Sequence, residues 1–218
     1  SILKINCDTD RWIISRLHNT VKTITKSFEK FEYFVAKNQA ESFFWKDFCD
    51  NYLELIKVRI YNPNNEDPTG QISAVHTCAF VLNIMLKLFA PFMPHITEEI
   101  YNVVFESTTS IHAQGTWARH EEIPYNKKMF VAGEFIEQIL STIRKFKTEE
   151  KISMKSEISL VNIISNTDTI TINDFGDLLQ DFKNAINTKV LSFNEDIAEK
   201  AYKKYFTEDK NFSIEIYK

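Results

Sequence analysis

Apolar residues recur at the three- and four-residue spacing of amphipathic helices from residue 8 to about residue 105, with few interruptions. The whole chain of 218 residues contains only 4 Gly and 5 Pro. This is too few for an architecture that must turn at the end of every short strand. The positions that mark the first helix are Trp12, Ile13, Leu17, Val21, Ile24, Phe28 and Phe31, and Asp8 or Thr9 can cap its start. A mainly α-helical fold is therefore expected.

The same spacing predicts a second helix over 35–61 and a third over 71–89, separated by a loop at 62–70 that is rich in Asn and Pro. Pro91 and Pro94 interrupt the third helix, and a shorter helix then begins near Ile96. Long helices with short connections pack as an antiparallel bundle. We assign residues 1–125 to this helical bundle.

In the second part of the chain, residues 126–218, a fifth long helix is followed by segments in which the spacing of apolar residues changes from that of a helix to that of strands. After an irregular stretch around 115–117, a helix is expected over 129–149. Alternating and β-branched residues then predict strands at 158–164, 190–193 and 212–216, with helices at 174–187 and 196–206 between them. The second part is expected to form a small α+β subdomain that packs on the bundle.

Charge and composition restrict the class of protein. The net charge of −4 argues against a protein that coats nucleic acid without selection. Residues 1–62 carry 10 Lys and Arg against 8 Asp and Glu, residues 63–118 carry 1 against 5, and residues 119–156 carry 8 against 6. An RNA contact is therefore expected on the first or the third of these segments. Three separated cysteines and the absence of a long apolar run indicate a protein of the reducing cytoplasm that does not contact a membrane. The amino terminus has no signal-peptide character and resembles an internal cut in a longer polypeptide.

No set of residues with the spacing of a catalytic or metal site appears in the sequence. Glycine-rich phosphate loops are absent, and the five histidines are scattered without metal-binding spacing. The segment 151–156 contains Lys and Ser but is interpreted as a linker. We expect no catalysis, no metal and no cofactor in this chain itself.

Basic and aromatic residues of the first two helices suit RNA binding, because unpaired bases stack on aromatic or guanidinium planes while Lys and Arg hold phosphates. The candidate RNA-binding residues are Arg11, Trp12, Arg16, Lys57 and Arg59. The alternative for each is a solvated charged face or, for Trp12, a place in the core.

Three segments in order resemble valyl-tRNA synthetases, a family of class I aminoacyl-tRNA synthetases. Residues 10–17 read DRWIISRL, residues 47–59 read DFCDNYLELIKVR, and residues 91–101 read PFMPHITEEIY. The first is also common in isoleucyl enzymes, whereas the second is typical of valyl enzymes. The similarity extends through Ser110–His112, Trp117 and 143–147 to about residue 160. Beyond residue 165 no segment resembles these enzymes.

The resemblance implies the anticodon-binding region of such an enzyme, without its catalytic domain. Its partners would be valine tRNA and the catalytic domain of the same polypeptide, which would use ATP and Mg²⁺ to activate valine; the region itself is expected to be monomeric. Alternatives are the same bundle from an isoleucyl enzyme, a helical protein-interaction module that uses the acidic surface of 63–118, and a stand-alone enzyme. The sequence identifies neither the bases contacted nor the role of residues 165–218.

Overall fold

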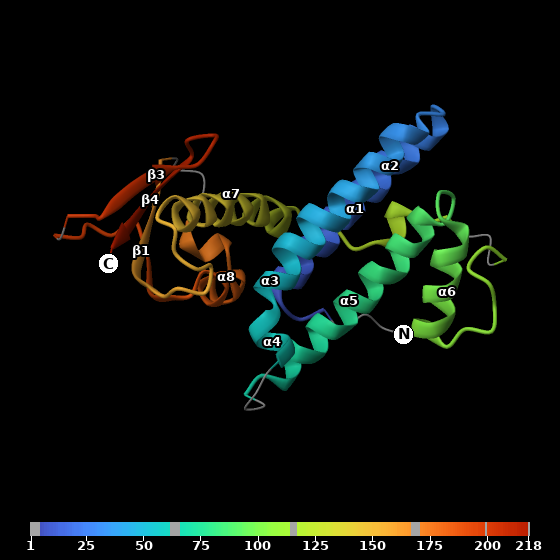
Figure 1. Ribbon diagram of the computed structural model, residues 1–218, viewed down its shortest axis with the longest axis horizontal. Helices are drawn as coiled ribbons and strands as arrows, with labels where there is room; N and C mark the ends of the chain where they lie inside the picture. Colours follow the sequence, from blue (N-terminus) through green and yellow to red (C-terminus); the bar gives the residue numbers. More distant parts are fainter. Residues whose placement is uncertain (1–4, 62–65, 114–116, 167–170, 199, 218) are drawn as a thin grey trace.

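The computed structural model describes residues 5–61, 66–113, 117–166, 171–198 and 200–217. Its largest feature is a hairpin of two long helical segments (Figure 1). The first is α1 (Asp8–Glu29), and the second runs through α2 (Tyr33–Ser42), a π-helical stretch η1 (Phe43–Tyr52), α3 (Leu53–Leu55) and α4 (Lys57–Tyr61). Both predicted helices are confirmed, but the first ends before Phe31, which lies in the turn between them.

The start of α1 differs from the expected capping. The N-cap residue is Cys7, which makes no side-chain cap, and neither Asp8 nor Thr9 occupies that position. The exposed backbone N–H of Asp8 instead donates to the Asp177 carboxylate at 2.6 Å. A residue 169 positions away therefore provides the acceptor that a helix start requires.

Two further helices complete the bundle. Helix α5 (Pro68–Phe89) begins three residues earlier than expected, because the Asp67 side chain accepts from the Gly70 N–H at 2.7 Å and caps it. Residues 62–65 of the predicted loop lie outside the described residues. Helix α6 (Pro94–Phe105) starts at Pro94, the second of the two prolines expected to interrupt the third helix. It packs beside the C-terminal half of α5 (Figure 1).

Helix α7 (Lys127–Glu149) joins the bundle to the second part of the chain. A short 3₁₀ turn, η2 (His120–Glu122), precedes it, while residues 115 and 116 of the expected irregular stretch are outside the described part. Helix α7 approaches α1 at Gly133, where an added Cβ would lie 1.8 Å from the indole Cδ1 of Trp12. Most buried apolar residues of both parts form one continuous cluster, and Leu86, Tyr101 and Ile111 form a second, smaller one.

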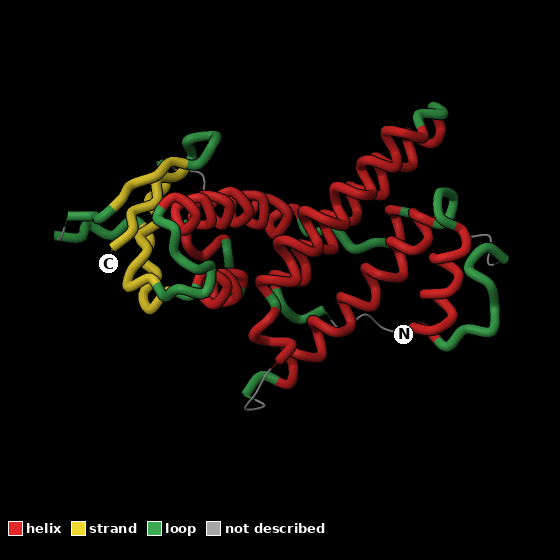
Figure 2. The backbone as a smooth tube through the Cα atoms, in the orientation of Figure 1, coloured by secondary structure: helices red, strands yellow, loops and turns green. Residues whose placement is uncertain are grey.

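A four-stranded sheet closes the end of the molecule beyond α7 (Figure 2). Its order is β2 (Thr188–Phe193), β1 (Ile158–Ser165), β4 (Phe212–Tyr217) and β3 (Lys203–Phe206). Strands β1 and β2 are parallel, and the connection between them contains the 3₁₀ turn η3 (Ile172–Asp174) and α8 (Leu178–Ile186). The other pairs are antiparallel, with Val161 opposite Ile216.

One secondary-structure prediction is wrong. The segment 196–206 was expected to be helical, but 203–206 forms β3 and pairs with β4. Charged residues interspersed with Ala and Tyr imitate helical spacing there, whereas tertiary pairing with β4 selects the extended form.

One helix has the length and composition of a possible membrane span, although the sequence analysis expects no membrane contact. Helix α5 is long and apolar enough to span a bilayer by length and composition, with a mean hydropathy of 1.7 over its most apolar window. Half of this most apolar stretch of α5 is buried inside the protein, as in the core helix of a soluble bundle.

Candidate nucleic-acid interface

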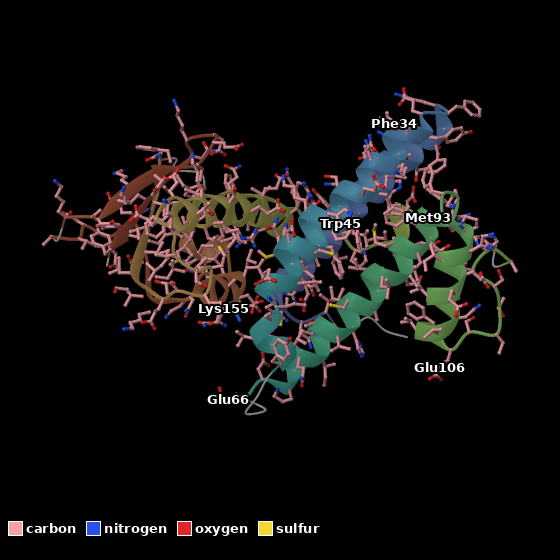
Figure 3. The ribbon with its side chains drawn as sticks, in the orientation of Figure 1. Phe34, Trp45, Glu66, Met93, Glu106 and Lys155 are labelled. Carbon is pink, nitrogen blue, oxygen red and sulfur yellow. The ribbon has the colours of Figure 1, made fainter. Side chains whose placement is uncertain are left out.

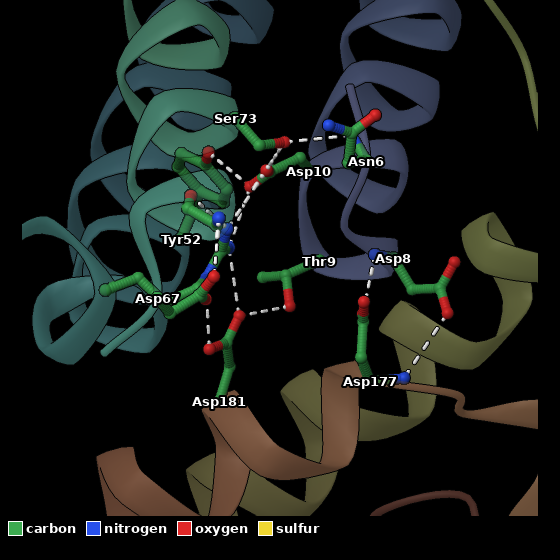
Figure 4. A network of polar contacts seen from close by, with 11 residues as sticks. Asn6, Asp8, Thr9, Asp10, Tyr52, Asp67, Ser73, Asp177 and Asp181 are labelled. Atoms are coloured by element: carbon green, nitrogen blue, oxygen red, sulfur yellow. Dashed lines mark hydrogen bonds and ion pairs between the residues drawn. The ribbon is translucent and has the colours of Figure 1, made fainter. Parts of the chain in front are cut away.

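The predicted RNA-binding residue Arg59 belongs to a buried polar network at the start of α1. Figure 4 shows other members of this network, among them Asp10, Tyr52, Ser73 and Asp181. Its Nη2 lies 2.8 Å from Asp10 Oδ1 and 2.9 Å from Asp181 Oδ2. Asp10 also accepts from the hydroxyl groups of Tyr52 and Ser73, at 2.8 and 2.5 Å. The guanidinium therefore joins α1, α4, α5 and α8 inside the protein.

Electrostatics agree with this structural role. Burial by itself lowers the pKa of Arg59, but hydrogen bonding and charge from Asp10, followed by the charge of Asp181, outweigh it and raise the pKa. Burial raises the pKa of the Asp181 carboxyl to about 6, against the opposing charge of Arg59. Arg59 remains charged, and its charge is neutralised by two buried carboxylates.

Trp12 is also unavailable to RNA in this conformation. Its side chain has no exposed surface and packs between α1 and Gly133 of α7. Stacking of a base requires an accessible ring face, which neither the Trp12 indole nor the Arg59 guanidinium presents. Trp12 therefore occupies the core, which was its alternative, whereas Arg59 is neither an exposed RNA contact nor part of a solvated face but a buried ion-pair partner.

The remaining three candidates are accessible but already paired. Arg11 lies 2.6 Å from Asp8, and Lys57 lies 2.5 Å from Glu54. Arg16 contacts Asp47 at 3.0 Å and Glu134 at 3.2 Å, and its side chain is only 26% exposed. The five predicted residues therefore do not form one surface, and any phosphate would have to compete with a carboxylate for each exposed cation.

The opposite end of α1 carries an unpaired basic stripe. Lys22, Lys26 and Lys30 are exposed, and none of the ion pairs between described residues involves them. Because they are spaced by four residues, they follow one side of the helix at intervals of about 6 Å. A row of unneutralised ammonium groups is suited to the phosphates of a nucleic-acid strand.

The stripe leads to exposed aromatic rings at the turn between α1 and α2. Phe31 is 77% exposed and Phe34 is 74% exposed, and Tyr33 lies between them. Figures 1 and 3 show this turn at the projecting end of the hairpin, with Phe34 labelled there. We call Lys22, Lys26, Lys30, Phe31, Tyr33 and Phe34 the tip surface.

The turn fixes Phe31 in an unusual backbone conformation. Its N–H donates to the carbonyl of Phe28 at 2.9 Å, and the N–H of Glu32 donates to the carbonyl of Ser27 at 2.8 Å. This pair of bonds is a Schellman ending, in which the residue that Phe31 occupies is usually glycine. Phe31 has φ 61°, so a bulky aromatic residue adopts the left-handed region at an energetic cost.

Further aromatic residues support the turn from below. The Phe28 ring lies 5.5 Å from Tyr33, 4.9 Å from Trp117 and 5.6 Å from Phe92. The Trp117 indole N–H donates to Thr25 Oγ1 at 2.9 Å, which holds this ring against α1. The exposed rings at the turn are therefore supported by packed aromatic side chains, so little conformational entropy of the turn would be lost on binding RNA.

Sequence reasoning missed the tip surface for a physical reason. Phe31 continues the apolar spacing of α1, so the pattern assigns it to the core. The available signal was the series Lys22, Lys26, Lys30, which ends beside Phe31 and Phe34. Among the described residues no group of His, Cys, Asp and Glu could hold a metal ion.

A helical bundle with a basic, aromatic tip is suited to RNA binding. The family model for the anticodon-binding domain of tRNA ligases matches residues 10–163. The chain therefore belongs to the anticodon-binding domains of tRNA ligases.

Similar curated proteins are valine–tRNA ligases. The protein from Rickettsia felis is 39% identical over 193 residues, which cover 88% of this chain and 21% of the relative. That from Rickettsia typhi is 41% identical over 87% of this chain and 22% of the relative, and that from Ehrlichia canis is 45% identical over 69% and 19%. The chain spans about a fifth of the length of the curated relatives it matches.

Proposed function

We propose that this chain binds the anticodon stem-loop of valine tRNA and positions the tRNA for a cytoplasmic valine–tRNA ligase. The observation that supports this most directly is the tip surface, where exposed rings adjoin unpaired lysines. Each stacked base contributes about 1–3 kcal/mol, and the lysines add a salt-dependent contribution. The valine–tRNA ligase relatives favour this specificity over the isoleucyl alternative.

Binding energy at the tip would serve orientation. Activation of valine with ATP and Mg²⁺, and transfer to tRNA, would occur in the catalytic domain of the same polypeptide. Holding the tRNA in one orientation makes the reaction of its distant end effectively intramolecular. The chain would act as a monomeric arm of the ligase.

The experiment compares the isolated chain with a variant in which Lys22, Lys26 and Lys30 are all replaced by Ala. Binding to a valine anticodon stem-loop is measured by fluorescence anisotropy over a salt series. Loss of three phosphate contacts reduces the slope of log K against log salt by about 2 to 3. The matched control replaces Lys183, Lys200 and Lys210, which lie on the α+β part, and should leave the slope unchanged.

A stem-loop with an altered anticodon tests recognition as well as charge. We expect weaker binding of the altered loop by the unmodified chain and a smaller difference when Phe34 is replaced by Ala. Equal binding of both loops, or an unchanged slope in the triple variant, would exclude the tip surface as an anticodon reader.

The accessible candidates Arg11, Arg16 and Lys57 are proposed as secondary phosphate contacts. Because each is paired with a carboxylate, we expect the double variant Arg16→Ala, Lys57→Ala to lower affinity less than the triple lysine variant does. A larger loss would place the main contact on the other end of the hairpin.

A further inference from the structure

Helix α5 carries an apolar stripe, and the described residues cover only half of its length. Its members are Ile72, Val75, Ala79, Leu82 and Leu86, which alternate spacings of three and four residues. This is the spacing of a helix that packs lengthwise against another helix. The stripe lies apart from the side of α5 that faces the bundle through Ser73, Thr77 and Val81.

Helix α6 covers the C-terminal half of the stripe. Leu86 is 5% exposed and lies in a cluster with Tyr101 and Ile111, against which Leu82 and Ile100 also pack. In the part of the chain that the structure describes, no element covers the N-terminal half in the same way. Ile72 is 47% exposed, Val75 is 50% exposed, and Ala79 is exposed beside them.

The uncovered half does not suit RNA or free solvent. No Asp, Glu, Lys or Arg occurs on α5 between Asp67 and Lys87, and residues 63–118 together carry 1 basic against 5 acidic residues. A phosphate backbone would gain no electrostatic attraction here. A contiguous, uncharged apolar face on one helix instead favours a protein partner.

We propose that Ile72, Val75 and Ala79 form the surface on which the catalytic part of the ligase docks. This inference rests on the proposed function. The relatives that match this chain have about four-fifths of their length outside the matched segment, so a large protein surface is available to cover the stripe. A helix of that part, placed in line with α6, would continue the packing seen at Leu82 and Leu86.

Docking at this place also meets a mechanical requirement. The tip surface lies at the free end of the α1–α2 hairpin, while the stripe lies on a different helix of the bundle (Figure 1). Both surfaces can therefore be occupied together. An anticodon reader contributes to catalysis only when its orientation to the reaction site is fixed, and a lengthwise helix contact fixes it.

The test replaces Val75 by Glu, both in this chain and in the full-length ligase that contains it. We expect the unfolding midpoint of the isolated chain to be unchanged, because Val75 is half exposed. In the full-length ligase we expect a lower midpoint and a loss of kcat/KM for aminoacylation on the order of tenfold, from misplacement of the tRNA. Val190→Glu on β2, at 48% exposure, is the matched control and should change neither.

Three results would overturn the proposal. An unchanged full-length V75E ligase would mean that no catalytic part covers the stripe. A V75E chain destabilised equally in isolation would assign the stripe to the chain's own fold. Concentration-dependent dimers of the isolated chain that V75E disperses, with no effect in the full-length ligase, would identify a second copy as the occupant. Stem-loop binding by the isolated V75E chain is measured separately, so failure of the proposed RNA binding is distinguishable from failure of docking.

Discussion

Replacing Phe31 by Gly and by Ala separates backbone strain at the tip from RNA binding. Both substitutions remove the same ring, but only Gly adopts φ 61° without a steric cost. The left-handed conformation costs a residue with a Cβ roughly 1–2 kcal/mol, whereas Gly loses about 0.5–1 kcal/mol more chain entropy on folding. The Gly variant should therefore be more stable than the Ala variant by about 0.5–1 kcal/mol.

The ring itself contributes little to folding. Phe31 is 77% exposed, so it buries about a quarter of its side chain. Full burial of such a side chain is worth about 1.5–3 kcal/mol, which leaves roughly 0.3–0.7 kcal/mol to lose in either variant. We expect Phe31→Gly to lie close to the unmodified chain in stability and Phe31→Ala to lie below both.

RNA affinity should follow a different order. Loss of one stacked base removes about 1–3 kcal/mol, which raises Kd roughly 5- to 150-fold in both variants. Phe31→Tyr keeps the ring and the strain, so it should retain affinity. Denaturant unfolding gives the free energies, and anisotropy with the valine anticodon stem-loop gives Kd.

Two results would refute this reasoning. If Phe31→Ala proves at least as stable as Phe31→Gly, then Phe31 does not occupy the left-handed conformation. If Phe31→Gly binds the stem-loop as tightly as the unmodified chain, then the strained ring serves no purpose in RNA binding. In that case the cost of placing Phe at this turn would have no explanation in the proposed interface.

Two further perturbations test the charged interior. Burial, followed by the charge of Asp47, raises the pKa of Glu137 from 4.5 to about 7. The folded state thus binds this proton more tightly than the unfolded state, so its contribution to stability is present at low pH and is lost as pH rises through about 7. Glu137→Gln should raise the free energy of unfolding at pH 8 by about 1–3 kcal/mol and flatten its dependence between pH 4.5 and 7, measured by urea unfolding; an unchanged slope would contradict the shift. Arg59→Lys keeps the charge but not the fork that binds two carboxylates, and should cost about 2–4 kcal/mol in the same assay, whereas a loss below 0.5 kcal/mol would show that the network contributes little.

The helices could be predicted because their determinants are local. The apolar spacing located α1, α5 and α7 within a few residues, and the scarcity of Gly and Pro favoured the helical class correctly. The loop at 62–70 was predicted too long, because Pro68 and the Asp67 cap begin a helix inside a segment that composition alone assigns to a turn.

The errors come from long-range contacts. Strand β3 exists because β4 pairs with it, and four residues do not reveal a partner. The same limit applies to Arg59, which is an ordinary helical arginine in the sequence. Only the fold brings Asp10 and Asp181 to either side of it, 49 and 122 positions away.

The position of Arg59 also explains how the two ends of α1 divide their roles. A buried arginine that holds two carboxylates from separate helices is a costly way to gain stability, because apolar residues of similar volume would stabilise at least as well. It does, however, require one arrangement of α1, α4 and α8, since each guanidinium nitrogen has an assigned partner. With its base fixed in this way, α1 extends as a rigid arm of 22 residues, about 33 Å long, to the tip surface. The buried network then sets the direction of the arm, and the proposed RNA contacts lie on exposed residues at its far end.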